Sequence, residues 1–354
     1  MATAELDSGL DAILGSQPEA MSDPFPIWRE LRETAPVLRH GGVVLISSYE
    51  EVKKWTRNTT DLSNRYSIEG NLFAANRERL APEQQQALLE IAEFESRYIS
   101  RSDGEQHERL RNVSHRAFTP RRIVAMEEAL KGYAEDLLNG LPADEPIDFR
   151  ERFAYRLPML AITEMLGVPP DRREEIHLWS NKLARNRGGD QPDAVMAAHE
   201  AMSDFRDYVE QTVVPARRED PGTDLVSALL EAEGSERLTG PEMTSTFVVL
   251  LFAGHETTTN LIAIGLRELL RDGEQWQRLL DQPDLIPGAV EELLRWVSPV
   301  QWISRISTRD QEIGEVEVQR GDAVQLVLAA ANRDPAVFAD PETLDVGRAD
   351  AREH

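Results

Sequence analysis

The stretch Gly240–Asp272, GPEMTSTFVVLLFAGHETTTNLIAIGLRELLRD, decides the fold that we expect for this chain. Pro241 and Glu242 suit the first turn of a helix, and the stretch ends on basic and polar residues. One continuous helix of this length would be roughly 46 Å long, enough to cross a whole domain. The flanking segments Phe247–Ala253 and Leu261–Leu266 are apolar on all sides, which predicts a buried helix.

The centre of this helix, Gly254–Asn260, is polar where packing alone would favour leucine. A buried carboxyl group such as that of Glu256 is costly without partners, and threonine hydroxyls compete for backbone carbonyls one turn back. We therefore expect a local opening of the helix at this point. A zinc-protease motif is excluded, because Thr259 stands where the second histidine after His255-Glu256 would be needed.

A spacing of three and four residues places Leu250, Ala253, Gly254 and Thr257 on one face of the helix. The two smallest of these residues would let a large flat group lie against the backbone. Glu256 and Thr257 would then be close enough to that group to handle protons. The alternative is a buried helix with a satisfied polar patch, and this stretch alone does not decide between the two interpretations.

The composition is that of a soluble globular protein, with 41% hydrophobic and 29% charged residues in 354. The net charge of -24 argues against nucleic acid and anionic membranes as partners. Because the sequence contains no cysteine, disulfides, a cysteine-type zinc site and a thiol nucleophile are excluded within these residues. No signal peptide, membrane span, linker or repeat is evident, so we expect one cytoplasmic domain covering residues 1–354.

The part of the chain before the long helix is predicted to be a small sheet followed by many helices. Within it, Ser63–Ser102 is polar and irregular with one helix inside Pro82–Phe94, and loops of this length are often functional. The other expected elements are a helix ending at about Arg32, strands Val37–Arg39 and Val43–Ile46, and helices Tyr49–Trp55, Arg122–Leu138, Arg150–Leu166, Arg172–Arg187, Asp193–Arg217 and Leu225–Glu233.

The part after the long helix is predicted to be helical first and then to change to strands. Glu292 and Arg295 lie three residues apart, a pattern common on exposed helices, but a buried pair would be costly and kept for a structural reason. The expected elements are helices Glu274–Leu280 and Ile286–Val297, strands Ile303–Ile306, Glu312-Ile313, Val316–Val318 and Ala323–Ala329, and a short helix that follows Ala331 and ends at Phe338.

A basic stretch stands out in this acidic chain. His107 and Arg111 are four residues apart, so both side chains could donate to one anion. A solvated helix face is the commoner explanation of such a pair. The neighbouring Arg109, Arg116 and Arg121 form either a charged surface or a docking patch for an acidic partner.

Four motifs, taken together and in this order, resemble the bacterial cytochromes P450, which are haem-thiolate monooxygenases, along the whole chain. They are His107-Glu-Arg-Leu-Arg111 ahead of Ala117-Phe-Thr-Pro120, Ala253-Gly-His-Glu-Thr-Thr258, Glu292-Leu-Leu-Arg295, and Ala330-Ala-Asn-Arg-Asp-Pro335. Each motif is weak alone, but the four at the family's spacing are specific. The resemblance implies a mainly α fold, a triangular helical domain with a long central helix and small β-sheets.

The resemblance also implies the cofactor, haem b (iron protoporphyrin IX). By position in the motifs, His107, Arg111 and Arg305 would bind the haem propionates. Ala253 and Gly254 would lie against the ring.

The same resemblance implies the chemistry. Glu256 and Thr257 would be the acid and alcohol that deliver protons to dioxygen, so the chain would insert one oxygen atom from O2 into a small organic substrate, with secondary metabolism as the setting. The substrate pocket would be lined by Leu250, Val300, Trp302, Ile303 and the segment Ser63–Phe94.

Two further sets of residues take their expected roles from the resemblance. A ferredoxin-type redox partner would dock near Arg109 and Arg116. Glu292 and Arg295 would be structural, with Arg348 as their third partner.

The sequence departs from the family's pattern at the iron ligand. The family uses a cysteine thiolate in a glycine-rich loop, whereas these residues contain no cysteine, so the ligand is expected after His354. The chain would then be either an oxygenase whose ligand loop lies beyond these residues or a haemless relative that is a structural or activating partner of another enzyme. Glu256, Thr257 and the propionate-binding set favour the oxygenase, because a buried acid is costly to keep without a use.

Overall fold

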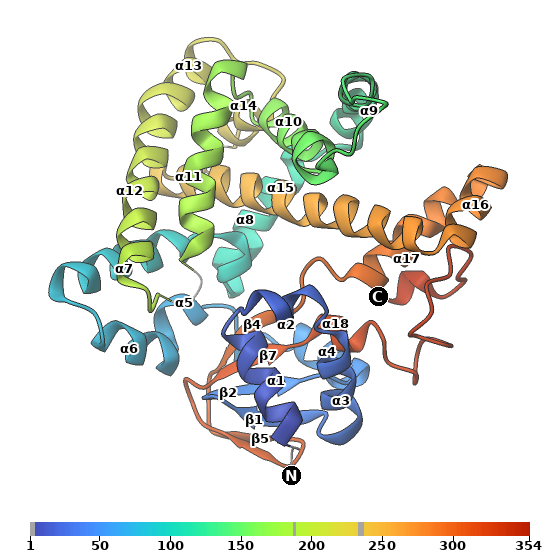
Figure 1. The fold of residues 1–354 in the computed structure, drawn as a ribbon. Helices are drawn as coiled ribbons and strands as arrows, with labels where there is room; N and C mark the ends of the chain where they lie inside the picture. Colours follow the sequence, from blue (N-terminus) through green and yellow to red (C-terminus); the bar gives the residue numbers. More distant parts are fainter. Residues whose placement is uncertain (1–3, 187–188, 233–236) are drawn as a thin grey trace. The chain divides into compact units, whose positions relative to one another are not determined.

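The computed structural model describes residues 4–186, 189–232 and 237–354, which form two compact units (Figure 1). The helical unit comprises Ser67–Glu69 and Phe73–Thr259. The sheet unit comprises the residues up to Tyr66, Gly70–Leu72 and Asn260–His354. The long helix α15 (Gly240–Arg271) contributes its first part to the helical unit and its last part to the sheet unit.

Helix α15 begins at a capping box. The backbone N–H and the hydroxyl of Thr239 donate to Glu242 Oε2 at 2.9 and 3.0 Å, and the Glu242 N–H donates to the Thr239 hydroxyl at 3.3 Å. The predicted long helix is therefore confirmed. The expected opening at its centre is wrong, because α15 is helical throughout Gly254–Asn260.

Among the described residues, α15 is the one helix long and apolar enough to cross a membrane, judged by length and composition. Its first part nevertheless lies in the core of the helical unit. Phe247, Val248 and Leu251 are fully buried there, so this part of α15 is the core helix of a folded unit.

The helical unit is built almost entirely from helices, and two of them, α5 and α6, begin with residues of the sheet unit. Helix α12 packs against both α11 and α7, and in Figure 1 α11 and α12 lie side by side. The elements are α5 (Tyr66–Glu69), α6 (Asn71–Glu78), α7 (Pro82–Glu95), η1 (Ile99–Arg101), α8 (Gly104–Ala117), α9 (Pro120–Asn139), the π-helical turn η2 (Arg150–Ala154), α10 (Arg156–Met165), η3 (Pro170–Arg172), α11 (Arg173–Arg185), α12 (Pro192–Tyr208), the π-helical turn η4 (Val209–Val213), α13 (Val214–Glu219) and α14 (Leu225–Leu230).

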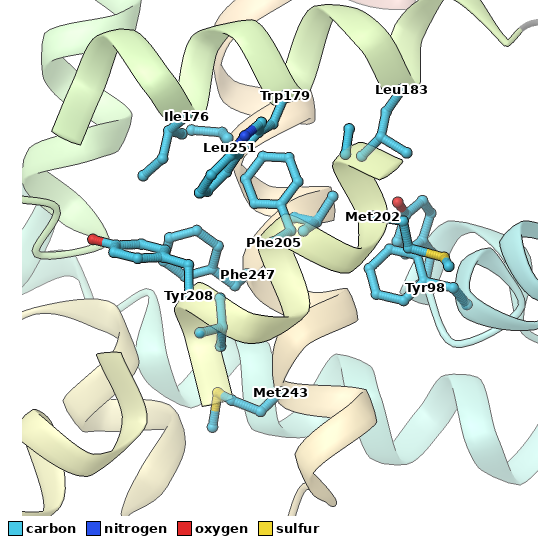
Figure 2. Close-up of a cluster of buried hydrophobic side chains, with 14 of the residues drawn as sticks. Tyr98, Ile176, Trp179, Leu183, Met202, Phe205, Tyr208, Met243, Phe247 and Leu251 are labelled. Carbon is cyan, nitrogen blue, oxygen red and sulfur yellow. The ribbon is translucent and has the colours of Figure 1, made fainter. Parts of the chain in front are cut away.

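An aromatic cluster forms the centre of this unit (Figure 2). Trp179 of α11 meets Phe205 of α12 edge to face, with ring centroids 5.1 Å apart. Tyr208 contacts Phe247 of α15 in the same way at 6.4 Å. These contacts join three helices, and aromatic pairs of this geometry add about 0.5–1.5 kcal/mol each beyond the area that they bury.

The sheet unit contains a five-stranded sheet of order β1-β2-β7-β4-β3, in which only β2 and β7 are parallel, and a separate hairpin of β5 and β6. Its strands are β1 (Val37–His40), β2 (Val43–Ile46), β3 (Leu62–Ser63), β4 (Ile303–Ser307), β5 (Gln311–Ile313), β6 (Val316–Val318) and β7 (Ala323–Leu326). Its helices besides α15 are α1 (Ala4–Leu14), α2 (Pro18–Ser22), α3 (Phe25–Thr34), α4 (Tyr49–Arg57), α16 (Gly273–Asp281), η6 (Pro283–Leu285), α17 (Ile286–Val297), α18 (Leu328–Ala331) and η7 (Ala351–Glu353).

Several predicted elements need correction. The segment Ser63–Ser102 is not an irregular loop with one helix, because α5, α6 and η1 also form within it. The predicted strand Ala323–Ala329 ends at Leu326, and the alanine-rich residues that follow form α18, because alanine favours helix. The short helix thus lies before Asn332 and not after it. The predicted helix ends Arg187 and Glu233 lie outside the described residues.

Candidate functional site

The centre of α15 is less buried than the apolar flanks of the helix predict. Ala253 and Glu256 are exposed, and Leu250, Gly254 and Thr257 are partly buried. The prediction of a buried Glu256 is therefore wrong. Thr257 Oγ1 donates to the Ala253 carbonyl oxygen at 2.8 Å, which is the one-turn hydrogen bond expected of a threonine in a helix.

The two small residues at this point have different surroundings. A Cβ added to Gly254 would lie 3.1 Å from Ile162 Cδ1, closer than an ordinary van der Waals contact. Gly254 therefore lets α10 approach α15 closely. Ala253 presents its methyl group on an exposed face of the helix.

Glu256 lines a cavity of about 170 Å³ that lies within the helical unit. The residues that α15 supplies to it lie on one face, which is not the face of Ala253 and Thr257. The rim is formed by exposed polar side chains, those of Arg150, Glu151 and Asn181 among them. The lining residues are Arg150, Glu151, Tyr155, His177, Ser180, Asn181, Ala184, Phe252, His255, Glu256 and Thr259.

Three rings pack together in the wall of this cavity. The Tyr155 ring meets His177 at 4.5 Å and His255 at 4.6 Å between centroids, both edge to face. The two imidazole centroids are 6.0 Å apart. The three rings thus join the cap residue between η2 and α10 to helices α11 and α15.

Both histidines in the wall are held neutral. Burial lowers the pKa of His255 to about 4, and the nearby His177 and Arg150 add to this shift. Burial likewise lowers the pKa of His177, although Glu174 and Glu151 act against it. Burial raises the pKa of the Tyr155 hydroxyl, so this group stays protonated as well.

The predicted propionate-binding pair lies on α8 in the helical unit. His107 is partly buried and Arg111 is exposed, one turn apart. Between them, Arg109 forms an ion pair with Glu242 that joins α8 to the first turn of α15. The Arg109 side chain therefore has a structural role in this ion pair. Arg116 is exposed, and the side chain of Arg121 lies outside the description.

The other predicted site residues lie in the sheet unit. Arg305 of β4 is partly buried and donates from Nη1 to the Ser304 carbonyl oxygen at 2.9 Å. Val300 is exposed, whereas Ile303 packs against the core beneath the sheet. Trp302 meets Trp28 edge to face at 6.0 Å, which gives it a packing role in this unit.

The predicted structural pair is fully buried in the sheet unit. Arg295 Nε and Nη2 donate to the two Glu292 carboxylate oxygens at 2.7 and 2.8 Å. Arg348, expected as the third partner, donates from Nε to Glu292 Oε1 at 3.1 Å and lies 3.0 Å from Oε2. Arg295 also donates to the carbonyl oxygens of Asn332 and Pro341, so the buried charges are well satisfied.

Sequence reasoning missed the cavity behind Glu256. Tyr155 and His177 stand in ordinary amphipathic helical segments, and nothing in their spacing indicates that they meet His255. Only His255 carried a signal, as a polar residue in an apolar helix. Within the described residues, no group of three or more His, Cys, Asp or Glu is arranged to hold a metal ion.

Comparison with known proteins gives relatives over most of the chain. The cytochrome P450 family model matches residues 183–352. The polyketide biosynthesis cytochrome P450 PksS of Bacillus subtilis is 31% identical over 346 residues, which cover 93% of this chain and 80% of that protein. The 6-deoxyerythronolide B hydroxylase of Saccharopolyspora erythraea is 33% identical over 361 residues, which cover 95% of this chain and 83% of that protein.

Solved structures agree with these relatives. A structure of Bacillus subtilis PksS superposes with a TM-score of 0.80 at 29% identity and covers 94% of this chain and 82% of that one. A structure of P450BioI in complex with an acyl carrier protein ligated to hexadec-9Z-enoic acid superposes with a TM-score of 0.81 at 27% identity. It covers 94% of this chain and 84% of that one. The predicted mainly α fold with small sheets is thereby confirmed.

Proposed function

The chain belongs to the cytochrome P450 family of haem-binding oxidoreductases, and we propose that it inserts an oxygen atom from O2 into a small organic substrate of secondary metabolism. The observation that carries this proposal is the adjacent acid and alcohol, Glu256 and Thr257, at the centre of α15 beside the exposed Ala253. The names of two relatives, a polyketide biosynthesis cytochrome P450 and a 6-deoxyerythronolide B hydroxylase, support a substrate of this class.

The described residues fit haem by the chemistry of their side chains. His107 and Arg111 offer nitrogen donors one turn apart on α8, which suits carboxylate groups such as propionates. Ala253 offers a small apolar contact on an exposed face of α15, and Arg305 would supply a further donor. When bound, the haem iron would supply the binding and reduction of O2. We assign no iron ligand, because none of the 354 residues is a cysteine.

Within this proposal, each α15 residue has a separate task. Thr257 holds a proton at its hydroxyl, which the bond to the Ala253 carbonyl oxygen orients. Glu256, at the edge of the cavity, relays protons through its carboxyl group and so renews the one that Thr257 passes on. Positioned proton transfer of this kind contributes about 10²–10⁴-fold to a rate. Leu250, Val300 and Ile303 are proposed to contact the substrate.

Haem content tests the proposal. The protein purified from haem-supplemented cells should carry stoichiometric haem, and its reduced form should bind carbon monoxide with a shift of the haem absorption band. Colourless protein that takes up no haem would contradict the oxygenase. It would favour the second candidate, a haemless structural or activating partner of another enzyme.

We also propose a ferredoxin-type donor that docks against the basic surface of α8. Arg116 is exposed on α8, and we propose that this docking depends on it. Arg116→Glu should slow reduction by the donor and weaken its salt dependence. If the parent and Arg116→Glu proteins were reduced at equal rates at every salt concentration, Arg116 would not be part of the docking surface.

A single domain in the cytoplasm is proposed with this function. The helix α15 continues through both units without a break, as a shared element of one domain would. Limited proteolysis should therefore release neither unit intact, and cell fractionation should find the protein in the soluble fraction. A stable fragment ending near Thr259, or membrane-bound protein, would contradict these two points.

A further inference from the structure

The cavity in the helical unit is bordered by polar atoms that the protein leaves unsatisfied. Among the described residues, His177 Nδ1, His255 Nε2 and Thr259 Oγ1 are buried without a hydrogen-bond partner, and all three residues line the cavity. His255 and Thr259 are only 7% and 2% exposed. Because buried polar groups in folded proteins are almost always paired, three unpaired groups around one cavity indicate a site for a ligand.

The two imidazoles offer opposite halves of a hydrogen bond to the cavity. The Asn181 amide nitrogen lies 2.9 Å from His177 Nε2, so Nε2 accepts and Nδ1 carries the proton of the neutral ring. His255 makes a hydrogen bond with the Tyr155 backbone, and because its Nε2 has no partner, this bond uses Nδ1–H. His177 therefore presents a donor, His255 presents an acceptor, and the Thr259 hydroxyl can be either.

The inner wall of the cavity favours a neutral ligand group. Burial lowers the pKa of both His177 and His255, so neither ring carries a charge near neutral pH. The charged residues of the lining, Arg150, Glu151 and Glu256, are all exposed, and Arg150 Nη1 lies 2.5 Å from Glu151 Oε1. An ionised group that reached the inner wall would lose its water of hydration without gaining a charged partner there.

The size and the rings of the cavity limit the ligand further. The volume of about 170 Å³ is far more than the 10–15 Å³ or so that one water molecule needs, so a molecule of several atoms fits. Phe252 and the Tyr155 ring supply aromatic surface to the lining. Small-molecule sites typically combine such apolar walls with a few polar groups that fix the orientation of the ligand.

We infer that this cavity is a binding site for a small molecule in which a primary amide is attached to a flat ring. A primary amide is neutral and has one carbonyl acceptor and two N–H donors. The carbonyl oxygen accepts from His177 Nδ1–H, and the two N–H groups donate to His255 Nε2 and Thr259 Oγ1. The ring of the ligand lies against Phe252 and Tyr155. Haem takes no part in this site, so the inference does not rest on the proposed function.

Benzamide, a primary amide on a phenyl ring, is the compound that tests the site. In an NMR titration it should bind the protein as purified with a Kd of about 1 mM or below. His177→Phe keeps a ring against Tyr155 but removes the donor, and Thr259→Val keeps the shape but removes the hydroxyl. Each should weaken binding about 10-fold. Thr259→Ser, and Thr258→Val outside the lining, should retain the parent's Kd.

Acetophenone provides the control on the side of the ligand, because it has a methyl group in place of the amide nitrogen. It should bind the parent protein at least about 10-fold more weakly than benzamide. His255→Phe should weaken the binding of benzamide about 10-fold and leave that of acetophenone unchanged, because acetophenone has no N–H to donate to His255. A misfolded variant would lose both ligands, and Thr259→Val would then decide.

The spectrum of the haem-loaded protein locates the bound benzamide. It should not change, because the cavity lies on a different face of α15 from Ala253. A parent protein that does not bind benzamide, or equal affinities in the parent, His177→Phe and Thr259→Val proteins, would overturn the inference. A shift of the haem spectrum with unchanged affinity in His177→Phe would place benzamide in the substrate pocket and overturn it too. A protein without haem would contradict only the proposed function, because the titration requires no haem.

Discussion

Glu256 and Thr257 are neighbours in the sequence, but a helix turns their side chains about 100° apart. Glu256 borders the cavity, whereas Thr257 is bonded back to the Ala253 carbonyl oxygen on another face. An acid and an alcohol placed in this way can pass a proton from one side of α15 to the other. This division of faces is the physical basis of the proposed proton supply.

His255 makes stability depend on pH. Its pKa is lowered to about 4 in the folded protein, mainly by burial, and is about 6.5 in an unfolded chain. Between these values the unfolded state binds more protons, so the free energy of unfolding falls as pH drops from about 6.5 to about 4. A shift of this size amounts to about 3 kcal/mol across that range.

Urea unfolding at several pH values checks this prediction. His255→Phe should remove most of the extra loss of stability below pH about 6.5, leaving the smaller part due to His177. His115→Phe, at an exposed position of α8, is the control and should keep the parent's pH dependence. Parallel stability curves for the parent and His255→Phe would contradict a neutral buried His255.

At this scale the sequence indicated the residues but not their surroundings. The motif around Ala253 identified Glu256 and Thr257, yet Glu256 was expected to be buried and is exposed. Burial depends on which helix packs on which face. Tyr155 and His177, which are about 80–100 positions away from Glu256, gave no sign that they lie beside it.

At the scale of the element, α15 combines a packed face and an open face at one point. Gly254→Val should destabilise the protein by about 1–3 kcal/mol, because the new side chain would meet Ile162 of α10. Ala253→Val on the exposed face should cost only about 0.5 kcal/mol in helix propensity, but it should lower haem occupancy. Denaturant unfolding and haem content measure the two effects.

The double variant Gly254→Val with Ile162→Ala provides the control, because it removes the side chain that the valine would meet. It should recover part of the stability lost by Gly254→Val relative to Ile162→Ala alone. If Ala253→Val proved the more destabilising change and left haem content untouched, the assignment of the two faces would be wrong.

Elements were the most predictable feature of this chain. The capping box at Thr239 and Glu242 and the long apolar flanks account for α15. The polar segment after Ser63 was misjudged, because its short helices have little apolar periodicity and pack through few side chains. The π-helical turns at Arg150–Ala154 and Val209–Val213 interrupt helices that the periodicity predicts to be continuous.

At the scale of the whole molecule, the buried group of Glu292, Arg295 and Arg348 stabilises the sheet unit. Glu292→Ala should destabilise the protein by about 3–5 kcal/mol, because it leaves the buried Arg295 guanidinium without its carboxylate. Glu291→Ala, at the partly exposed neighbouring position, should change stability by about 0.5 kcal/mol or less. Thermal and urea unfolding of both variants measure the difference.

Equal effects of these two substitutions would mean that the buried pair does not stabilise the fold.

The sequence could suggest this pair only through family resemblance, because a glutamate and an arginine three residues apart occur on many exposed helices. Its burial follows from contacts with Asn332, Pro341 and Thr343, which lie about 40–50 residues further along the chain.

The most direct test of the central claim, that the centre of α15 supplies protons to oxygen, is the fraction of consumed O2 released as hydrogen peroxide by the haem-loaded protein with a compound that shifts its haem spectrum. We predict that Thr257→Val and Glu256→Gln each raise this fraction and slow product formation by about 10²-fold, while Thr258→Val changes neither. Parent-like peroxide release and product formation in both variants would contradict the claim.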